Sequence, residues 1–118
     1  MGLYFHSDYP KATVYVTCML PDSSCSEGAF RKQGWWKIDY GDTVEVLSGD
    51  LTKVIAGGYF YFNAHGADGS VWAGAFDTLV SNAKFNQCYF DDTGMTENAG
   101  YREYNLPFVA SYTVNLIP

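Results

Sequence analysis

Basic side chains are scarce in this sequence. The 118 residues include 7 Lys and Arg against 13 Asp and Glu, which gives a formal net charge of −6. Only Arg31 and Lys32 are adjacent, and the other basic residues are scattered along the chain. A protein that binds nucleic acid normally concentrates positive charge to neutralise phosphates. We therefore expect no nucleic-acid partner.

Long hydrophobic runs are also missing. No stretch approaches the roughly 20 apolar residues that a membrane-spanning helix needs, so we expect no membrane insertion. The start, MGLYFHSDYP, lacks the basic and apolar regions of a secretory signal peptide. The compartment stays open: a cytoplasmic protein, export by a non-classical route, or a chain numbered after processing.

Cysteine is limited to three residues, Cys18, Cys25 and Cys88. An odd number is not a disulfide framework, and three reduced thiols are the favoured expectation. A local bridge between Cys18 and Cys25 stays open, because these residues bracket a turn-rich stretch. No CxxC pair or nearby histidine accompanies them, so we expect no zinc site.

Short runs rich in Val, Thr, Tyr and Phe fill most of the chain, separated by clusters of Gly, Asp, Asn, Ser and Pro. This pattern is typical of strands and turns, and no long amphipathic helix interrupts it. Residues 81–90 are ambiguous between strand and helical turn, and residues 20–28 and 91–100 are expected loops. Strands are expected at 2–6, 12–19, 34–38, 43–48, 55–64, 71–76, 101–106 and 109–117. The sequence thus predicts a single all-β domain over residues 1–118, an antiparallel β-sandwich or flattened barrel of about eight short strands.

Two adjacent tryptophans raise the main question about surfaces. Neighbouring side chains of a strand point to opposite faces, so Trp36 is expected inside and Trp35 outside, on the face of Lys37. Three explanations for Trp35 stay open. The segment 20–33 covers it, with Phe30 and Pro21 as candidates; it lies at a subunit interface; or it stacks on a sugar ring.

The pattern GWW, YFYFNA, VWAG and a late cysteine extends over roughly residues 30 to 116. Its residues are Gly34, Trp35, Trp36, Gly41, Tyr59, Tyr61, Ala64, Trp72, Gly74, Phe76 and Cys88. In this pattern the chain resembles the bacterial family known as domain of unknown function 1036. The resemblance implies a bacterial origin and a β fold, and it implies no activity. Relatives often carry cysteines where this chain has Asp42 or Thr43 and Asp77, so it implies no disulfide pairing either.

No catalytic constellation stands out. The two histidines, His6 and His65, have no recognisable nucleophile and acid partner. Carboxylates such as Asp91 with Asp92, or Asp39 with Asp42, are explained by turns. We therefore expect a protein that is not an enzyme, and a small hydrolase is the least favoured alternative.

Two loops are rich in oxygen ligands, NAHGADGS at 63–70 and DDTGMTEN at 91–98. Neither has the spaced acidic residues of a calcium-binding EF-hand, and both are expected as solvated turns. No cofactor is expected. If calcium binds, Asp91, Asp92 and Glu97 are its expected ligands.

The surplus of aromatic residues, 18% of the chain, favours a binding surface. The first expectation is a non-enzymatic module that recognises a carbohydrate or a cell-surface ligand. The alternative is a structural subunit that self-associates through its β edges and surface aromatics, unless the uncharged first and last strands pair with each other inside one subunit. The expected ligand-binding residues are Trp35, Trp72, Tyr59, Tyr61, Asn63, Asp68 and Asn98.

Overall fold

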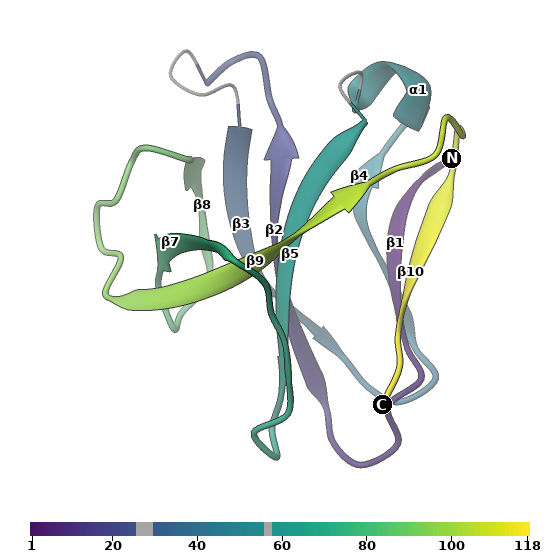
Figure 1. Ribbon diagram of the computed structural model, residues 1–118, viewed down its shortest axis with the longest axis vertical. Helices are drawn as coiled ribbons and strands as arrows, with labels where there is room; N and C mark the ends of the chain where they lie inside the picture. Colours follow the sequence, from purple (N-terminus) through teal and green to yellow (C-terminus); the bar gives the residue numbers. More distant parts are fainter. Residues whose placement is uncertain (26–29, 56–57) are drawn as a thin grey trace.

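The computed structural model describes residues 1–25, 30–55 and 58–118; parts of the expected loop 20–28 and of the expected strand 55–64 lie outside them. The described residues form ten strands in two sheets and one helical turn (Figure 1). The all-β prediction is therefore confirmed, with more strands than expected. The elements are β1 (Gly2–Ser7), β2 (Val14–Pro21), β3 (Phe30–Ile38), β4 (Thr43–Ser48), α1 (Leu51–Val54), β5 (Tyr59–Gly66), β6 (Val71–Trp72), β7 (Phe76–Val80), β8 (Phe85–Cys88), β9 (Glu97–Asn105) and β10 (Tyr112–Leu116).

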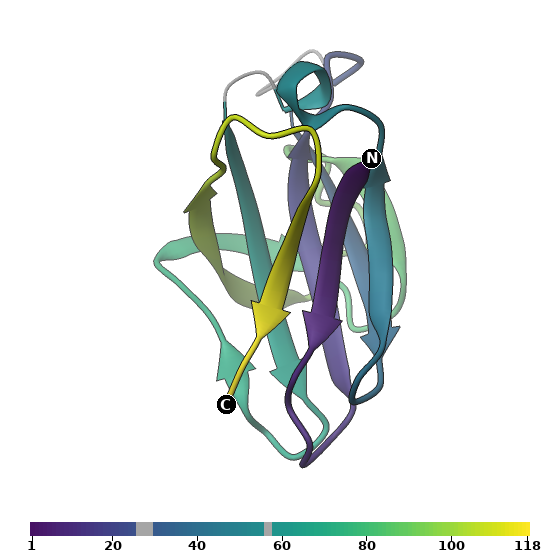
Figure 2. The same cartoon turned by 90° about the vertical axis from the view of Figure 1, so that its right-hand side faces the viewer.

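The smaller sheet has three strands in the order β10-β1-β4. The first strand pairs in parallel with the last, with Leu3 opposite Tyr112, and antiparallel with β4. Figure 2 shows β10 and β4 on either side of β1. The two ends of the chain thus pair inside one subunit, and β1 has no free edge.

The larger sheet follows the order β7-β9-β5-β2-β3-β8, with β6 added on β5, and it curls into an antiparallel half-barrel. Strand β9 causes the curl, because its end pairs with β5 while its beginning pairs with β7. Figure 1 shows β9 sweeping across the other strands of this sheet toward β7. The half-barrel therefore has one face toward the smaller sheet and a second, concave face.

The first hydrophobic core fills the space between the two sheets. Phe60 and Phe62 of β5 are buried there, and Phe5 of β1 packs edgewise on Phe62 with ring centroids 5.3 Å apart. Tyr59 and Tyr61 point the other way, as the alternation along β5 predicts. Each fully buried side chain of this kind contributes about 1.5–3 kcal/mol of transfer free energy.

A second core lies on the concave face of the half-barrel. Met19, Val80, Phe85 and Tyr101 are buried in it. The Tyr101 hydroxyl is within 2.7 Å of the Thr17 hydroxyl, and burial raises the pKa of Tyr101. Both faces of the larger sheet therefore carry a core, which explains why β5 is aromatic on both sides.

One charged side chain is fully buried beside this second core. Lys32 of β3 donates from Nζ to the Leu79 carbonyl at 2.8 Å and to the Asp92 carboxylate at 2.7 Å. These contacts join β3 to β7 and to the segment before β9. A buried ammonium needs such partners, because leaving it without them costs several kcal/mol.

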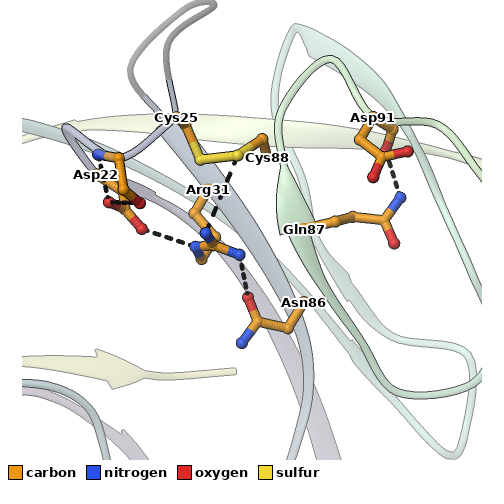
Figure 3. The surroundings of a disulfide bond; sticks show 8 residues. Asp22, Cys25, Arg31, Asn86, Gln87, Cys88 and Asp91 are labelled. Carbon is orange, nitrogen blue, oxygen red and sulfur yellow. Dashed lines mark hydrogen bonds and ion pairs between the residues drawn. A yellow bond between two sulfur atoms is a disulfide. The ribbon is translucent and has the colours of Figure 1, made fainter.

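The cysteines depart from the expectation of three reduced thiols. Cys25 and Cys88 form a disulfide between the turn after β2 and the end of β8, so a Cys18–Cys25 bridge is wrong as well. Cys18 is free and buried. Figure 3 shows Arg31 beside the disulfide, where its Nε donates to Asp22 at 2.7 Å. This bond lowers the pKa of Asp22 to about 2.

Several element boundaries differ from the predicted ones. The helical turn α1 lies between two expected strands, where Asp50 caps it by accepting from the Thr52 amide. The expected strand 71–76 contains the two-residue strand β6 and the first residue of β7. Strand β9 begins inside the expected loop 91–100. The ambiguous segment 81–90 contains β8. Within the described residues, no helix has the length and apolar character needed to span a bilayer.

Candidate functional site

A cavity of about 620 Å³ opens on the concave face of the half-barrel. Side chains of β2, β3 and β5 form one wall, and the segment 80–84 together with the beginning of β9 forms the other. Trp35 of β3 lies in the first wall, and we refer to the space as the Trp35 cavity. Its volume falls within the roughly 300–1,000 Å³ of small-molecule sites.

Three aromatic rings stand side by side along the first wall. Tyr15 and His65 lie directly opposite each other in the β2–β5 ladder, and their rings stack with centroids 5.5 Å apart and 27° between planes. The Trp35 ring meets the imidazole edgewise, with centroids 5.0 Å apart. His65 therefore contacts both Tyr15 and Trp35, and the three rings form a continuous aromatic surface.

The Trp35 indole is held in place by the opposite wall. Its Nε1 donates to the Ser81 carbonyl at 2.8 Å, and Phe85 packs edgewise on it at 6.2 Å. Trp35 is half-buried as a result. Among the described residues, its cover comes from the 81–85 segment, while Phe30 of the expected 20–33 cover packs on Tyr61 instead.

His65 presents a neutral imidazole to the cavity. Burial lowers its pKa below the ordinary value of 6.5, so the ring is uncharged at pH 7. No described side chain or backbone group hydrogen-bonds to either ring nitrogen. A neutral imidazole has one N–H donor and one acceptor nitrogen, and both are open to a ligand.

Asn63 places a polar group in the floor of the cavity. The residue is only 7% exposed, and its Nδ2 donates to the Gly100 carbonyl at 2.8 Å. Its Oδ1 has no partner in the described part of the chain. Since no fully buried side-chain oxygen there lacks a partner, this Oδ1 reaches the cavity surface. The exposed amides of Asn82 and Asn98 lie on the second wall.

Three charged side chains also line the cavity. Lys37 belongs to the first wall, and Lys84 and Glu97 belong to the second. All three are exposed. Their positions make the opening polar, whereas the interior is mainly aromatic and aliphatic.

The predicted ligand-binding residues separate into two regions. Trp35, Asn63 and Asn98 meet in the Trp35 cavity. Trp72 belongs to the first core, where it packs edgewise on Tyr9 and its Nε1 donates to the Ile117 carbonyl at 2.9 Å. A single surface shared by Trp35 and Trp72 is therefore absent from the described residues.

Of the other three predicted residues, Asp68 and Tyr61 have local partners and Tyr59 is exposed. Asp68 accepts a hydrogen bond from the Tyr9 hydroxyl and from the Ser70 amide in the β5–β6 turn. Tyr61 packs on Phe76 in the second core. Tyr59 is 43% exposed at the start of β5. None of the three lines the Trp35 cavity.

The expected calcium ligands are not brought together. Over the described ranges, no group of three His, Cys, Asp or Glu side chains is placed to hold a metal ion. Asp92 pairs with Lys32, and Asp91 accepts from the Thr93 amide. Hydrogen bonds from the side chain and the amide of Thr93 lower the pKa of Asp91. Glu97 lies at the cavity instead.

Sequence reasoning did not select Tyr15, His65, Lys37 and the 81–84 segment as parts of the site. Alternation places Lys37 on the face of Trp35, and Tyr15 on the face opposite Val14 and Val16, so a partial signal exists. Alternation does not show that β2 pairs with β5, and this pairing places Tyr15 opposite His65.

Comparison with protein-family models, with curated proteins and with solved structures finds no match. The likeness to the domain of unknown function 1036 therefore stays a proposal, carried by the residue pattern alone.

Proposed function

We propose that this protein is a non-enzymatic binding module that recognises a carbohydrate in the Trp35 cavity. The aromatic wall of Tyr15, His65 and Trp35 is the observation that carries the proposal. The C–H groups of a sugar ring pack on aromatic faces, and a few polar groups then set its orientation. The Asn63 Oδ1 and the neutral His65 imidazole supply an acceptor, a donor and a second acceptor for sugar hydroxyls.

The surroundings of His65 support binding rather than catalysis. General acid–base or nucleophilic chemistry needs a hydrogen-bonded partner that orients the imidazole. Its neighbours here are two aromatic rings, and no described carboxylate or hydroxyl hydrogen-bonds to it. We infer that the imidazole acts as a contact surface.

A glycan array followed by calorimetric titration tests the proposal. Trp35→Leu removes the aromatic face, and we expect about a fivefold loss of affinity, because an aromatic contact contributes about 1 kcal/mol beyond area burial. Trp72→Leu is the matched control. It also removes an indole that donates to a backbone carbonyl, yet it lies outside the cavity and should retain affinity.

His65→Ala serves as a second cavity variant, and near-ultraviolet circular dichroism checks that each variant is folded. Folded wild-type protein that binds no glycan on the array would overturn the proposal. So would equal losses from Trp35→Leu and Trp72→Leu.

A second candidate function is self-association through surface aromatics. An apolar hollow of about 190 Å³ lies at the edge of the second core, and two of its rings, Phe76 and Phe90, are 48% and 58% exposed. Exposed aromatic groups of this kind anchor protein interfaces. Sedimentation velocity would show a concentration-dependent dimer that Phe90→Ser abolishes. A monomer at every concentration would remove this candidate.

A further inference from the structure

Two lysines with no ion-pair partner among the described residues line the Trp35 cavity. Lys37 follows Trp35 by two positions on β3, so the same strand face carries both side chains. Lys84 lies in the connection from β7 to β8, immediately before the Phe85 that packs on Trp35. Both ammonium groups are exposed, and no hydrogen bond from either reaches a described group.

Three of the other five cations, Arg31, Lys32 and Arg102, are engaged elsewhere. Arg31 pairs with Asp22, and Lys32 is buried against Asp92. Arg102 lies over an aromatic ring. The chain carries a formal charge of −6, so positive groups free to meet a ligand are rare on this protein.

Among the described residues that line the cavity, one carries an opposing charge. Glu97 comes from the beginning of β9, on the second wall, and no ion pair within 4.0 Å links it to Lys37 or Lys84. Two ammonium groups against one carboxylate leave the cavity positive while the whole molecule is negative. An anionic group on the ligand is therefore favoured at this place.

We propose that the ligand is an acidic saccharide, one with a uronic acid ring, whose carboxylate is held by Lys37 and Lys84 while its ring packs on Trp35. This inference rests on the proposed carbohydrate-binding function and adds the chemical class of the sugar. A bond between an ammonium and a carboxylate is about twice as strong as a neutral hydrogen bond.

The test compares each acidic ligand with an ester that lacks its charge and carries one added methyl group. Short oligomers of galacturonic, glucuronic and mannuronic acid are titrated calorimetrically beside their methyl esters, which keep the ring and lose the carboxylate charge. We expect one acid form to bind about tenfold more tightly than its ester, a difference of about 1.4 kcal/mol. Sodium acetate at the same concentration should not compete.

Substitutions of single charged residues test which side chains cause the preference for the acid over its ester. Lys37→Met and Lys84→Met should each weaken binding of the acid about fivefold and leave binding of the ester unchanged. Glu97→Gln should strengthen binding of the acid a few-fold, which a purely structural role would not predict. Lys53→Met is the control, because it changes the net charge equally on the exposed side of α1, and it should have no effect.

Each outcome separates the two proposals. If no acid, ester or neutral sugar binds, the carbohydrate-binding function itself fails. If the ester binds as tightly as the acid, or Lys37→Met and Lys84→Met change nothing, the module binds neutral sugars and the inference about charge is overturned. If Lys53→Met weakens binding as much as Lys37→Met, or acetate competes, the attraction is non-specific and the inference is overturned too.

Discussion

Reducing the Cys25–Cys88 disulfide should remove a large part of the stability of this domain. The bridge joins residues 63 positions apart and encloses the chain from β3 to β8. In the chain-entropy model, releasing a loop of that length stabilises the unfolded state by about 4 kcal/mol at 25 °C. Domains of this size are stable by roughly 5–15 kcal/mol, so reduction should bring the protein close to unfolding under mild denaturant.

Reduction should also weaken ligand binding before it unfolds the protein. Strand β8 has four residues and lies at the edge of the larger sheet, where β3 is its one pairing partner among the described strands. The disulfide anchors its last residue, Cys88, and the segment 81–84 that precedes the strand forms a wall of the Trp35 cavity. Losing the bridge loosens this wall, because a short edge strand has few other contacts to hold it.

Urea unfolding followed by tryptophan fluorescence measures the effect. The oxidised protein, the protein with a phosphine reductant, and the double variant Cys25→Ala/Cys88→Ala are compared. Reduction and the double variant should each lower the free energy of unfolding by about 4 kcal/mol, and reductant should do nothing further to the double variant. Thiol titration of the unfolded chain should count one free thiol without reductant, that of Cys18, and three with it. A change below about 1 kcal/mol on reduction, or three free thiols without reductant, would refute the reasoning.

Three further predictions follow from single contacts. Asp92→Asn removes the negative charge that faces the buried Lys32 ammonium. It should lower the free energy of unfolding by about 1–3 kcal/mol, less than for a fully enclosed pair because Asp92 is half-exposed. Adding Lys32→Met should recover part of the loss, and urea unfolding that shows no recovery would contradict this. Gly34→Ala should lower the free energy of unfolding by about 1–3 kcal/mol in the same assay, because a Cβ at this glycine would lie 2.6 Å from Cε1 of Phe85. An unchanged free energy of unfolding would be inconsistent with this packing. Burial lowers the pKa of His65, so the unfolded chain binds a proton more readily than the folded protein just below pH 6.5. The free energy of unfolding should therefore fall as the pH drops through that value. His65→Gln should flatten this part of the plot of stability against pH, and an unchanged slope would count against the buried imidazole.

Alternation along the strands was predictable from the sequence because it is a local property. Strand β4 has the predicted bounds, with Val46 buried and Glu45 exposed. Trp35 and Trp36 do point to opposite faces: Trp36 packs on the first core and Trp35 on the second. Alternation does not predict the curl of the larger sheet. Because of this curl, the face of Trp35, expected on the outside, is the concave face of a half-barrel.

The curl depends on contacts between distant segments. Gly74 lies against the backbone of β9, where a Cβ would be 2.6 Å from the Cα of Arg102, and β9 starts within a stretch so polar that it is expected as a loop. The pairing of Cys25 with Cys88 is equally remote in sequence. Residue spacing carries no information about such pairs, so the second wall of the cavity could not be predicted.

The high aromatic content led us to predict one ligand-binding surface that includes both Trp35 and Trp72, and the structure places these two residues in different regions. Trp72 has the same ring as Trp35, but its indole donates to the Ile117 carbonyl and its ring is covered by Tyr9. Asn63 and Asn98 line the same cavity as Trp35. The imidazole of His65 lines it too because β2 and β5 are neighbours, which only the topology reveals.

The indole N–H signals of the three tryptophans test the central claim most directly. In a ¹⁵N–¹H spectrum of the wild-type protein, each indole gives one peak, and no substitution is needed. Titration with the tightest saccharide from the array should move the Trp35 peak in a saturable way, because its N–H bonds to the cavity wall at Ser81, while the Trp72 peak stays in place. A bound saccharide that shifts the Trp72 peak and leaves the Trp35 peak unmoved would contradict the account.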